Sequence, residues 1–397
     1  MKYKFYEEHH WDEEINIETI SNGTIKEIQY KKFHNHAVRV INQNNKMGFY
    51  ISTGDFDKDA SFKAADINAY LPTNVPSENN HFVANIDIYE DTSEKQSIEL
   101  IREKLLDTFN FEKIDYVLTL EESKQHKSIS NSYGVKGSWE LKCLDISVEF
   151  RHKTTKRLLA IRRFHIKSYS NLIRIYEQLS SLPILSNSIL YNFNGPFILS
   201  PNVVMEYLFP IQNLILQSIC VTEKINHNLT IKETNKGIYQ IPFDDEGVIP
   251  TEKIIYQEGI YRNPIFSDLS DEVSTGNGLK IDYRRLPRVS PLVWEINPGN
   301  QELQNFIKHS ERAILIDTVV QSRIDKFSGC MISNVITSYL IENGEISGIL
   351  PDFNIIVDPV CLFEHEHLIV CKETEFTDNH FYKLPYIITD QVYIIGR

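Results

Sequence analysis

The chain has 397 residues, of which 42% are hydrophobic and 24% charged, as in an ordinary globular protein and unlike a disordered one. Its 41 Lys and Arg residues and 54 Asp and Glu residues give a net charge of −13. This balance argues against general binding of nucleic acids or anionic membranes, because both need a basic surface. No apolar run approaches the roughly 18–20 residues of a membrane span, and the polar start of the chain lacks the apolar core of a signal peptide. We therefore expect a cytoplasmic protein with no nucleic-acid or membrane partner.

The first half of the chain has the pattern of an α+β fold. Asn22-Gly23 lies between two extended runs and predicts a tight hairpin, and the polar turn 43–46 predicts a second one. Apolar residues at spacings of three and four predict three helices. The first covers 61–70, the second begins after a cap at Ser93, and the third covers 167–179. Alternating residues predict strands over 114–120, 128–150 and 157–166.

The second half is predicted to be rich in strands. Ser200-Pro201 predicts the start of a helix, because serine caps the first turn and proline fits its first position. One further helix is expected at about Gln301–Leu315, and the remaining turns separate strands. We expect three parts: an N-terminal α+β domain over 1–85, a central α+β region over 86–195 and a C-terminal β-rich domain over 196–397.

The five cysteines are odd in number and widely spaced, without a C-x-x-C pair. This pattern does not fit a disulfide framework or a zinc knuckle. We expect reduced and mostly buried thiols at Cys143, Cys220, Cys330, Cys361 and Cys371.

Four turns of the second half occur in a characteristic order: PFDDEGV (Pro242–Val248), STGNG (Ser274–Gly278), NPG (Asn297–Gly299) and YLIENGEI (Tyr339–Ile346). In this order and spacing they resemble the TldD/PmbA family of bacterial peptidase subunits. The N-terminal hairpins and the segment Ser130–Trp139 are similar to the same family. The resemblance implies a strongly β C-terminal domain and a dimer that encloses a chamber for an unfolded peptide.

The resemblance also implies which type of subunit this is. Active members carry a His-Glu-x-x-x-His helix, whose histidines bind zinc while the glutamate acts as general base. The matching helix here opens at Ser200 and has no histidine, and Glu206 has no imidazole beside it. Glu206 is expected to be a solvated carboxylate. The chain therefore resembles the non-catalytic TldE/PmbA type, with no cofactor of its own and with zinc expected in a TldD-like partner.

Two sets of residues are candidates for a site. Ser274, Thr275, Gly276 and Asn277, with Arg284 and Arg285, are predicted to bind peptide, although a structural turn and solvated arginines are the alternative. In a strand, His365, His367 and Cys371 would share one face and offer zinc three ligands. An edge strand or surface loop is the alternative for this segment. His9 and His10 are also close to carboxylates, but neighbouring residues diverge in regular structure.

Three functions remain open at this point. The chain is a non-catalytic subunit that pairs with a TldD-like catalytic chain, a homodimer that binds peptides without chemistry, or a zinc peptidase with an atypical ligand set. For the first of these we expect less than one zinc per chain. We also expect a dimer formed through the C-terminal β domain, and a peptide gripped along the edge of a sheet in the β-rich half.

Overall fold

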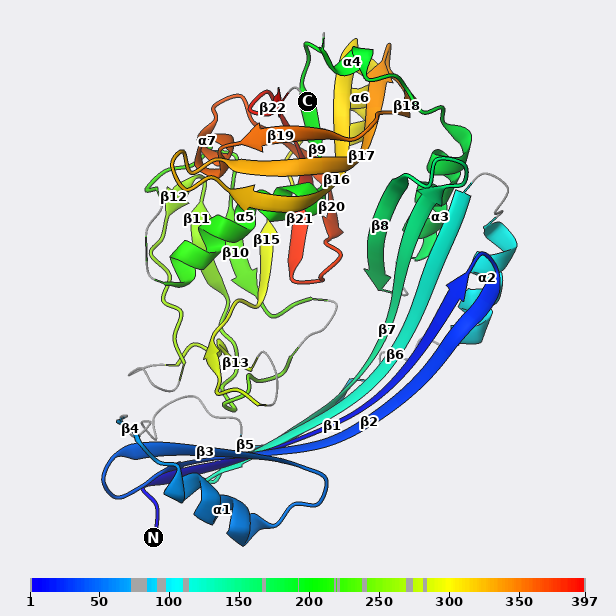
Figure 1. Ribbon diagram of the computed structural model, residues 1–397. Coiled ribbons are helices and arrows are strands. Elements are labelled where there is room, and N and C mark those ends of the chain that lie inside the picture. The colour runs from blue at the N-terminus through cyan, green and yellow to red at the C-terminus, as the bar shows by residue number, and fades with distance from the viewer. Residues whose placement is uncertain are drawn as a thin grey trace.

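The protein consists of two β-sheets with helices packed on them, which confirms the predicted α+β class and its β-rich second half (Figure 1). The structure is a computed structural model. It describes residues 2–72, 84–90, 98–109, 114–165, 169–191, 193–217, 219, 222–237, 241–268, 274–280 and 284–395.

The first sheet has eight strands in the order β4-β3-β2-β1-β6-β7-β5, with β8 also paired to β7. Its strands are β1 (Phe5–Ser21), β2 (Thr24–Ile41), β3 (Lys46–Thr53), β4 (Leu71–Pro72), β5 (Ala84–Glu90), β6 (Ile114–Asn131), β7 (Lys136–His152) and β8 (Leu158–His165). This sheet draws strands from both of the first two predicted domains. The boundaries of independent folding units therefore stay a prediction.

The turns of this sheet follow from their residues. Asn22 and Gly23 have φ angles of 46° and 78°, the left-handed values that a two-residue hairpin between β1 and β2 requires. β2 and β3 form the second predicted hairpin. Figure 1 shows the sheet as a long curved layer whose concave face is turned toward the second sheet and its loops.

The described residues of the first half of the chain form four helices: α1 (Lys58–Ile67), α2 (Ile98–Thr108), α3 (Tyr169–Ser181) and α4 (Ser188–Tyr191). α1 begins three residues before its predicted start because the side chain of Asp57 caps it by accepting from the Ala60 N–H. α3 matches its prediction and buries Leu172 and Ile175. The cap predicted at Ser93 lies outside the described residues.

The second sheet has twelve strands in the order β12-β11-β10-β15-β21-β9-β16-β17-β19-β22, with β18 on β17 and β20 on β21. A separate ribbon pairs β13 (Gly278–Leu279) with β14 (Arg288–Val289). The strands of the sheet are β9 (Phe197–Leu199), β10 (Ile231–Thr234), β11 (Lys253–Gln257), β12 (Ile260–Tyr261), β15 (Val293–Ile296), β16 (Arg312–Ile324), β17 (Met331–Glu342), β18 (Glu345–Ile349), β19 (Phe353–Val357), β20 (Ile369–Phe376), β21 (Tyr382–Thr389) and β22 (Tyr393–Ile395).

Three helices pack on this sheet: α5 (Pro201–Leu216), α6 (Leu303–His309) and α7 (Pro359–Glu364). α5 begins as predicted, because Ser200 Oγ accepts from the Val203 N–H and Pro201 occupies the first turn. The helix predicted over Gln301–Leu315 is wrong beyond His309. Its second half belongs to β16, because residues from Arg312 onward pair with β17, and Ile314–Ile316 also pair with β9 and are buried between the two strands.

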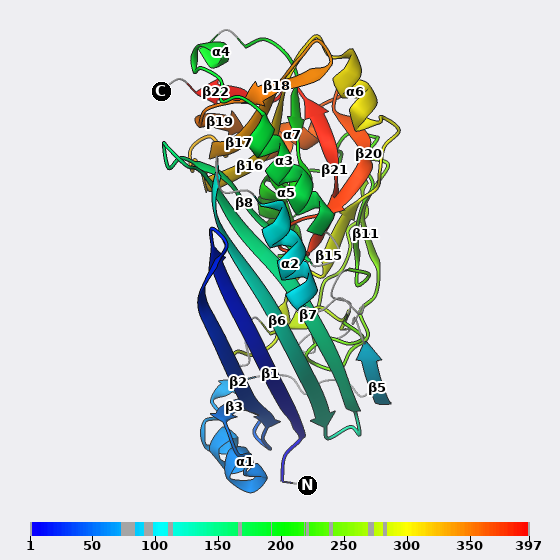
Figure 2. The same cartoon turned by 90° about the vertical axis from the view of Figure 1, so that its right-hand side faces the viewer.

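One hydrophobic core links the two sheets. It contains Leu118 and Val148 of the first sheet, Leu172 of α3, and Ile198 and Ala313 of the second sheet. The second sheet has a further core around α5. Figure 2 shows α2 and α3 along one side of the long strands. Among the described residues, no helix is long and apolar enough to cross a membrane.

Candidate functional site

A buried ion-pair network joins the concave face of the first sheet to the loop Pro242–Val248. Arg39 of β2 donates from Nη2 to Glu7 Oε2 at 2.8 Å and from Nη1 to Glu246 Oε1 at 2.9 Å. The side chains of Glu7 and Glu246 are 0% and 1% exposed, and that of Arg39 is 10% exposed. A guanidinium between two carboxylates compensates charges that are costly to bury alone. The network therefore determines where this loop lies on the sheet.

His9 extends the network along the same face of β1, where its Nε2 contacts Glu7 Oε1. Burial, reinforced by the charge of Lys280, lowers the pKa of His9 to about 4. Burial alone would raise the pKa of Glu7, but the charge of Arg39 and the hydrogen bond from His9 hold that pKa at about 2. At neutral pH His9 is therefore an uncharged donor to an ionised Glu7, since an ionised carboxylate can only accept.

The loop Pro242–Val248 is shaped by Asp244. Its Oδ1 accepts from the backbone N–H groups of Glu246 and Val248, both at 2.9 Å, and its Oδ2 accepts from Gly278 N–H at 2.8 Å. Burial and the charge of Glu246 nevertheless raise the pKa of Asp244 well above its usual value. A Cβ on Gly278 would lie 2.4 Å from Glu246 Oε2 and 3.0 Å from Asp244 Oδ2. Only glycine lets the second turn approach the two carboxyl groups this closely.

Two lysines lie beside this loop. Lys127 Nζ is 3.3 Å from Asp245 Oδ1, and it lies 3.9 Å from the ring centre of Trp11 and 5.2 Å from that of Trp139. A cation between two indole faces is held by their quadrupoles as well as by the carboxylate. Burial lowers the pKa of Lys280 to about 8, and its backbone N–H donates to Asp245 Oδ2 at 2.7 Å. Cationic and acidic groups thus alternate along the junction, the contact between the concave face of the first sheet and the loop Pro242–Val248.

A cavity of about 300 Å³ opens next to these lysines, between the concave face of the first sheet and the second half of the chain. Its volume is within the lower range of small-ligand pockets, about 300–1,000 Å³. The apolar part of the lining includes Trp139, Leu141, Ile241, Leu292 and Phe381. The charged part includes Lys127, Lys280, Arg163, Asp145 and Asp245. An apolar wall with a few charges of both signs suits a ligand that is itself amphipathic.

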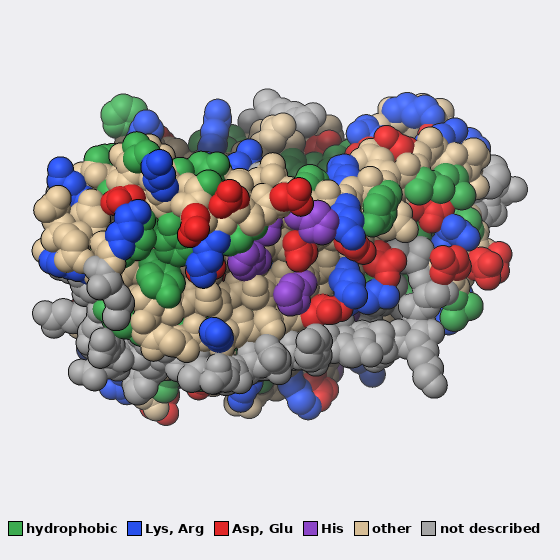
Figure 3. Space-filling model, turned by 90° about the horizontal axis from the view of Figure 1, so that it is seen from below, with side chains coloured by type: hydrophobic (Ala, Val, Ile, Leu, Met, Phe, Trp, Pro, Cys, Tyr) green, Lys and Arg blue, Asp and Glu red, His purple; other side chains and the backbone are tan. Residues whose placement is uncertain are grey.

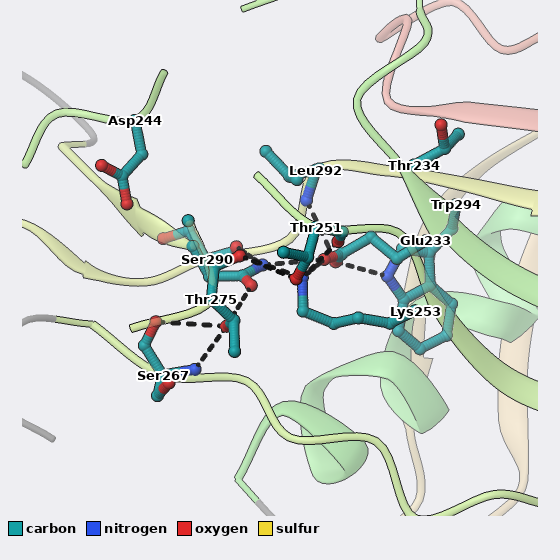
Figure 4. Close-up of polar contacts among 12 residues, drawn as sticks. Glu233, Thr234, Asp244, Thr251, Lys253, Ser267, Thr275, Ser290, Leu292 and Trp294 are labelled. Carbon is teal, nitrogen blue, oxygen red and sulfur yellow. Dashed lines mark hydrogen bonds and ion pairs between the residues drawn. The ribbon is translucent and has the colours of Figure 1, made fainter. Parts of the chain in front are cut away.

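The turn Ser274–Gly278, predicted to bind peptide, is held in place by a hydrogen bond from Asn277 to the buried Glu233. Glu233 is fully buried and accepts from Lys253 Nζ at 3.1 Å and from Asn277 Nδ2 at 2.8 Å. It also accepts from the Leu292 N–H at 3.2 Å and from Trp294 Nε1 at 3.1 Å. Figure 4 shows Glu233 between these donors. The side chain of Asn277 is therefore used within the chain.

The other residues of that turn also have internal partners. Thr275 Oγ1 donates to Asn277 Oδ1 at 2.8 Å and accepts from the Ser267 N–H at 2.9 Å; Figure 4 shows Thr275 and Ser267 in contact. Ser274 is buried. Gly276 has a φ of 74° and packs on Pro250. These contacts favour the structural alternative for the turn itself. The next two residues after it, Leu279 and Lys280, line the cavity instead.

Arg284 and Arg285 are exposed and lie outside the residues that line the cavity. Their role in binding peptide stays a prediction. Arg163 of β8 lines the cavity in their place, and its Nη2 is 2.6 Å from Asp145 Oδ2.

The helix α5 contains no histidine, and Glu206 on it is not the solvated carboxylate that we expected. Glu206 is half-buried, and burial raises its pKa although a hydrogen bond from Ser322 opposes the shift. Val203 and Val204 pack into the core, which explains why this turn of the helix is apolar. The donors on α5 do not fit a zinc ion.

The second candidate zinc set is not assembled as predicted. The segment is not one strand: His365 ends α7, His367 lies in a turn, and β20 begins only at Ile369. Cys371 is 0% exposed within the apolar core, and burial raises the pKa of its thiol to about 12. A thiol in such surroundings is a poor metal ligand, because the thiolate is the binding form. Within the described part of the chain, no three His, Cys, Asp or Glu side chains are placed to hold a metal ion.

The pair His9-His10 divides between the two faces of β1, as adjacent strand residues must. His10 turns to the outer face, where its Nδ1 lies 2.6 Å from that of His36 on β2. On the same face His34 Nδ1 is 2.9 Å from Asp12 Oδ1. Figure 3, which views the molecule from below Figure 1, shows histidines grouped with acidic and basic side chains.

Four cysteines are described, and all four are free thiols. Cys143 and Cys371 are buried, as expected, but Cys361 is exposed and Cys330 is half-buried. Cys220 lies outside the described residues.

Sequence reasoning did not identify Arg39, Lys127 or Lys280. The available signal was in β1, where charged residues occupy both faces of a long strand. A strand whose two faces are both charged indicates that one of them meets polar groups from elsewhere in the chain. The turn Pro242–Val248 was recognised, but its partner on the sheet could not be named.

Comparison with known proteins agrees with this architecture. The crystal structure of TldE from Thermococcus kodakarensis has a TM-score of 0.78 at 16% identity, covering 99% of this chain and 97% of that one. A proposed DNA gyrase modulator from Thermotoga maritima gives 0.78 at 16% identity, covering 99% and 96%. A similar protein from Bacteroides thetaiotaomicron gives 0.74 at 12% identity, covering 100% and 95%. These likenesses show the fold.

Two sequence comparisons point the same way. A metalloprotease of Methanocaldococcus jannaschii is 27% identical over 114 residues, a match that spans 28% of this chain and only a quarter (25%) of that relative. Residues 222–396 match the family model described as the PmbA/TldA metallopeptidase C-terminal domain. They contain all four turns completely, including Pro242–Val248, the loop that meets Arg39. The fourth turn, Tyr339–Ile346, forms the end of β17 and the start of β18 within the same region. Residues 222–396 therefore match the PmbA/TldA metallopeptidase C-terminal domain, and the chain as a whole shares its fold with TldE of Thermococcus kodakarensis.

Proposed function

We propose that this chain is the non-catalytic, TldE/PmbA-like subunit of a TldD/TldE-type metallopeptidase pair in the cytoplasm. In this proposal a TldD-like partner holds the zinc and cleaves the peptide. This chain helps to form the chamber and binds the unfolded substrate next to the partner's active centre. The likeness of the whole fold to TldE of Thermococcus kodakarensis supports this assignment.

The observation that carries the proposal is the chemistry of α5. A zinc peptidase needs at least two imidazoles around an open coordination position and a carboxylate placed as general base. Residues Pro201–Leu216 include no imidazole, and Glu206 is bonded to Ser322 instead. His365, His367 and Cys371 do not supply a replacement, since the thiol is in the core. In this proposal, no catalytic step uses a metal ion bound to this chain.

Substrate binding is assigned to the cavity beside Lys127 and Lys280. An unfolded peptide offers its backbone, its termini and scattered apolar side chains. The walls formed by Trp139, Leu141 and Leu292 would accept apolar side chains, and the two lysines would attract a carboxylate. This places the peptide on the concave face of the first sheet, whereas we had expected an edge in the β-rich half.

The first experiment is reconstitution. The purified chain, alone and mixed with a TldD-like chain that carries His-Glu-x-x-x-His, is assayed for cleavage of an unstructured peptide and for zinc by elemental analysis. We expect cleavage only by the mixture, and less than stoichiometric zinc in this chain. One zinc per chain that is lost in His365→Ala or Cys371→Ala would refute the subunit assignment and favour a peptidase with its own ligands.

The second experiment tests the cavity. Lys127→Gln keeps a polar, slightly shorter side chain but removes the charge between the two indoles. We expect it to raise KM for a peptide with a free carboxylate about tenfold, the equivalent of about 1.4 kcal/mol, with little change in kcat. Lys63→Gln on the exposed face of α1 is the matched control. If Lys127→Gln behaves like the control, while Arg284→Ala/Arg285→Ala raises KM, the peptide binds near the arginines.

A further inference from the structure

One edge of the first sheet is open over eleven residues. β2 pairs with β1 along its whole length, but β3 covers its other side only from Asn35 to Ile41. No strand among the described residues pairs with the outer side of Thr24–His34. Figure 2 shows β1 and β2 at one margin of the sheet. Apart from the His34 C=O, which accepts from the Gly54 N–H, the outward N–H and C=O groups of this segment have no backbone partner among the described residues and can pair with another strand.

The open edge also carries large apolar side chains. Ile28 is 65% exposed, Tyr30 64%, Ile25 46% and Phe33 40%. Natural edge strands are normally protected by charges, prolines, bulges or short length. This edge has a bulge at Lys26 and charged residues on both sides of Ile28 and Tyr30. Those two large apolar side chains are nevertheless about two-thirds exposed beside the open edge, which suits coverage by another strand.

We infer that the occupant is the same edge of a second copy of this chain, paired antiparallel about a two-fold axis perpendicular to the sheet. The axis passes through Gln29, so that residue i of one copy faces residue 58 − i of the other. Glu27 then faces Lys31 of the other copy twice, and Ile28 faces Tyr30 twice. Opposite charges and apolar pairs directly across two strands stabilise a sheet.

Neighbouring registers lose this complementarity. An axis through Ile28 places Glu27 opposite the neutral Gln29. An axis through Tyr30 places Glu27 opposite Phe33. β2 has a bulge at Lys26, so the regular register runs from Glu27 to Lys31 and does not place Lys26 directly opposite Lys32. Lys32 Nζ is 2.5 Å from Glu14 Oε1 on β1, which offsets its charge.

The backbone has the polarity that this register needs. His34 C=O points away from β1, since it accepts from the Gly54 N–H at 2.9 Å. Because strand residues alternate, Ile28 and Tyr30 also point their N–H and C=O groups outward. In the proposed register these two residues form hydrogen-bonded pairs across the interface. The Gly54 contact also ends the open edge, so the partner hairpin fits beside β3 without displacing it.

This self-association is independent of the proposed function. It uses the first sheet, whereas pairing with a TldD-like chain is expected through the C-terminal β domain. Either contact can fail while the other persists. Edge pairing would join two chains, or two heterodimers, into one continuous sheet.

Charge reversal tests the register. Glu27→Lys and Lys31→Glu each place like charges across the interface twice, so each is expected to raise the dissociation constant of the edge contact about tenfold in sedimentation experiments. The double variant Glu27→Lys/Lys31→Glu restores opposite charges and should return it to near the wild-type value. Glu252→Lys and Lys63→Glu, at exposed positions elsewhere, are the matched controls. Any one of three results would overturn the proposal: the wild type does not associate as its concentration rises, the single variants behave like the controls, or the double variant does not recover the wild-type dissociation constant.

A crosslink tests the contact without reference to any other interface. Two Gln29 residues would face each other as a non-hydrogen-bonded pair, with Cα atoms about 4.5 Å apart, which is within the range of a disulfide. Gln29→Cys should give a covalent dimer on mild oxidation. Lys63→Cys should not, and the wild type reports any background from Cys361. Absence of the Gln29→Cys dimer at concentrations where the wild type associates would exclude this register.

Discussion

Replacing Arg39 by methionine would remove the cation from between two carboxylates while keeping much of the side-chain volume. The net effect of the surroundings lowers the pKa of Glu7 from 4.5 to about 2. A shift of this size is equivalent to about 3 kcal/mol. Without Arg39 that stabilisation is lost, and Glu246 also remains buried without its partner. We therefore expect Arg39→Met to destabilise the fold by about 3–5 kcal/mol at pH 7.

The assay is the urea midpoint of unfolding, measured from pH 8 down through the acid range toward pH 2. The depressed pKa of Glu7 contributes stability above the unfolded value of 4.5 and loses it as pH falls toward 2. The difference between wild type and Arg39→Met should therefore be largest above pH 5 and shrink below it. Arg39→Met/Glu7→Gln/Glu246→Gln removes all three charges and should recover most of the loss.

The matched control is Arg174→Met, because Arg174 is 53% exposed and its ion pair with Glu375 is 3.6 Å long. It should cost less than about 1 kcal/mol. A loss below about 1 kcal/mol for Arg39→Met, or a triple variant no more stable than the single one, would refute the reasoning that this network is held by mutual charge compensation.

Three further changes probe the same junction. The pKa of His9 is lowered from 6.5 to about 4, so the folded chain resists protonation there and should lose about 3 kcal/mol of stability as pH falls through that window. His9→Gln should therefore reduce the slope of the free energy of unfolding, measured in urea, against pH. An unchanged slope would contradict this. Gly278→Ala brings a Cβ to 2.4 Å from Glu246 Oε2 and should cost about 1–3 kcal/mol by thermal unfolding, with a wild-type melting temperature as the contrary result. Glu233→Gln leaves the buried ammonium of Lys253 uncompensated and should cost about 3 kcal/mol or more in urea, whereas Glu233→Gln/Lys253→Met should cost less than the single change.

Local features of the fold were predictable because their causes are local. Asn22-Gly23 determines a hairpin, and Ser200-Pro201 determines the start of α5, whatever surrounds them. The helix predicted over Gln301–Leu315 was wrong in its second half because apolar residues suit a buried strand as well as a helix. Only pairing with β9 and β17, which is not visible in a local pattern, decides between the two.

The candidate site was harder to predict because its parts come from distant segments. The turn Pro242–Val248 was recognised, but Arg39, which fixes it, lies 207 positions away from Glu246. His365 and His367 were grouped with Cys371 on the assumption of one strand, and the end of α7 separates them. Residues that only tertiary packing brings together can be identified only once the structure is known.

The separation of Arg39 from Glu246 also has a consequence for how the protein is made. A ribosome adds about 5–20 residues per second, so the 207 positions between them take about 10–40 s to synthesise. During that interval β1 and β2 can pair, and Glu7 can hold Arg39, but the concave face of the sheet has no covering loop. Trp11, which lies on the same concave face of β1 as Glu7, would stay in contact with water until that loop is made. The nascent chain should therefore be a substrate for chaperones until the second half emerges.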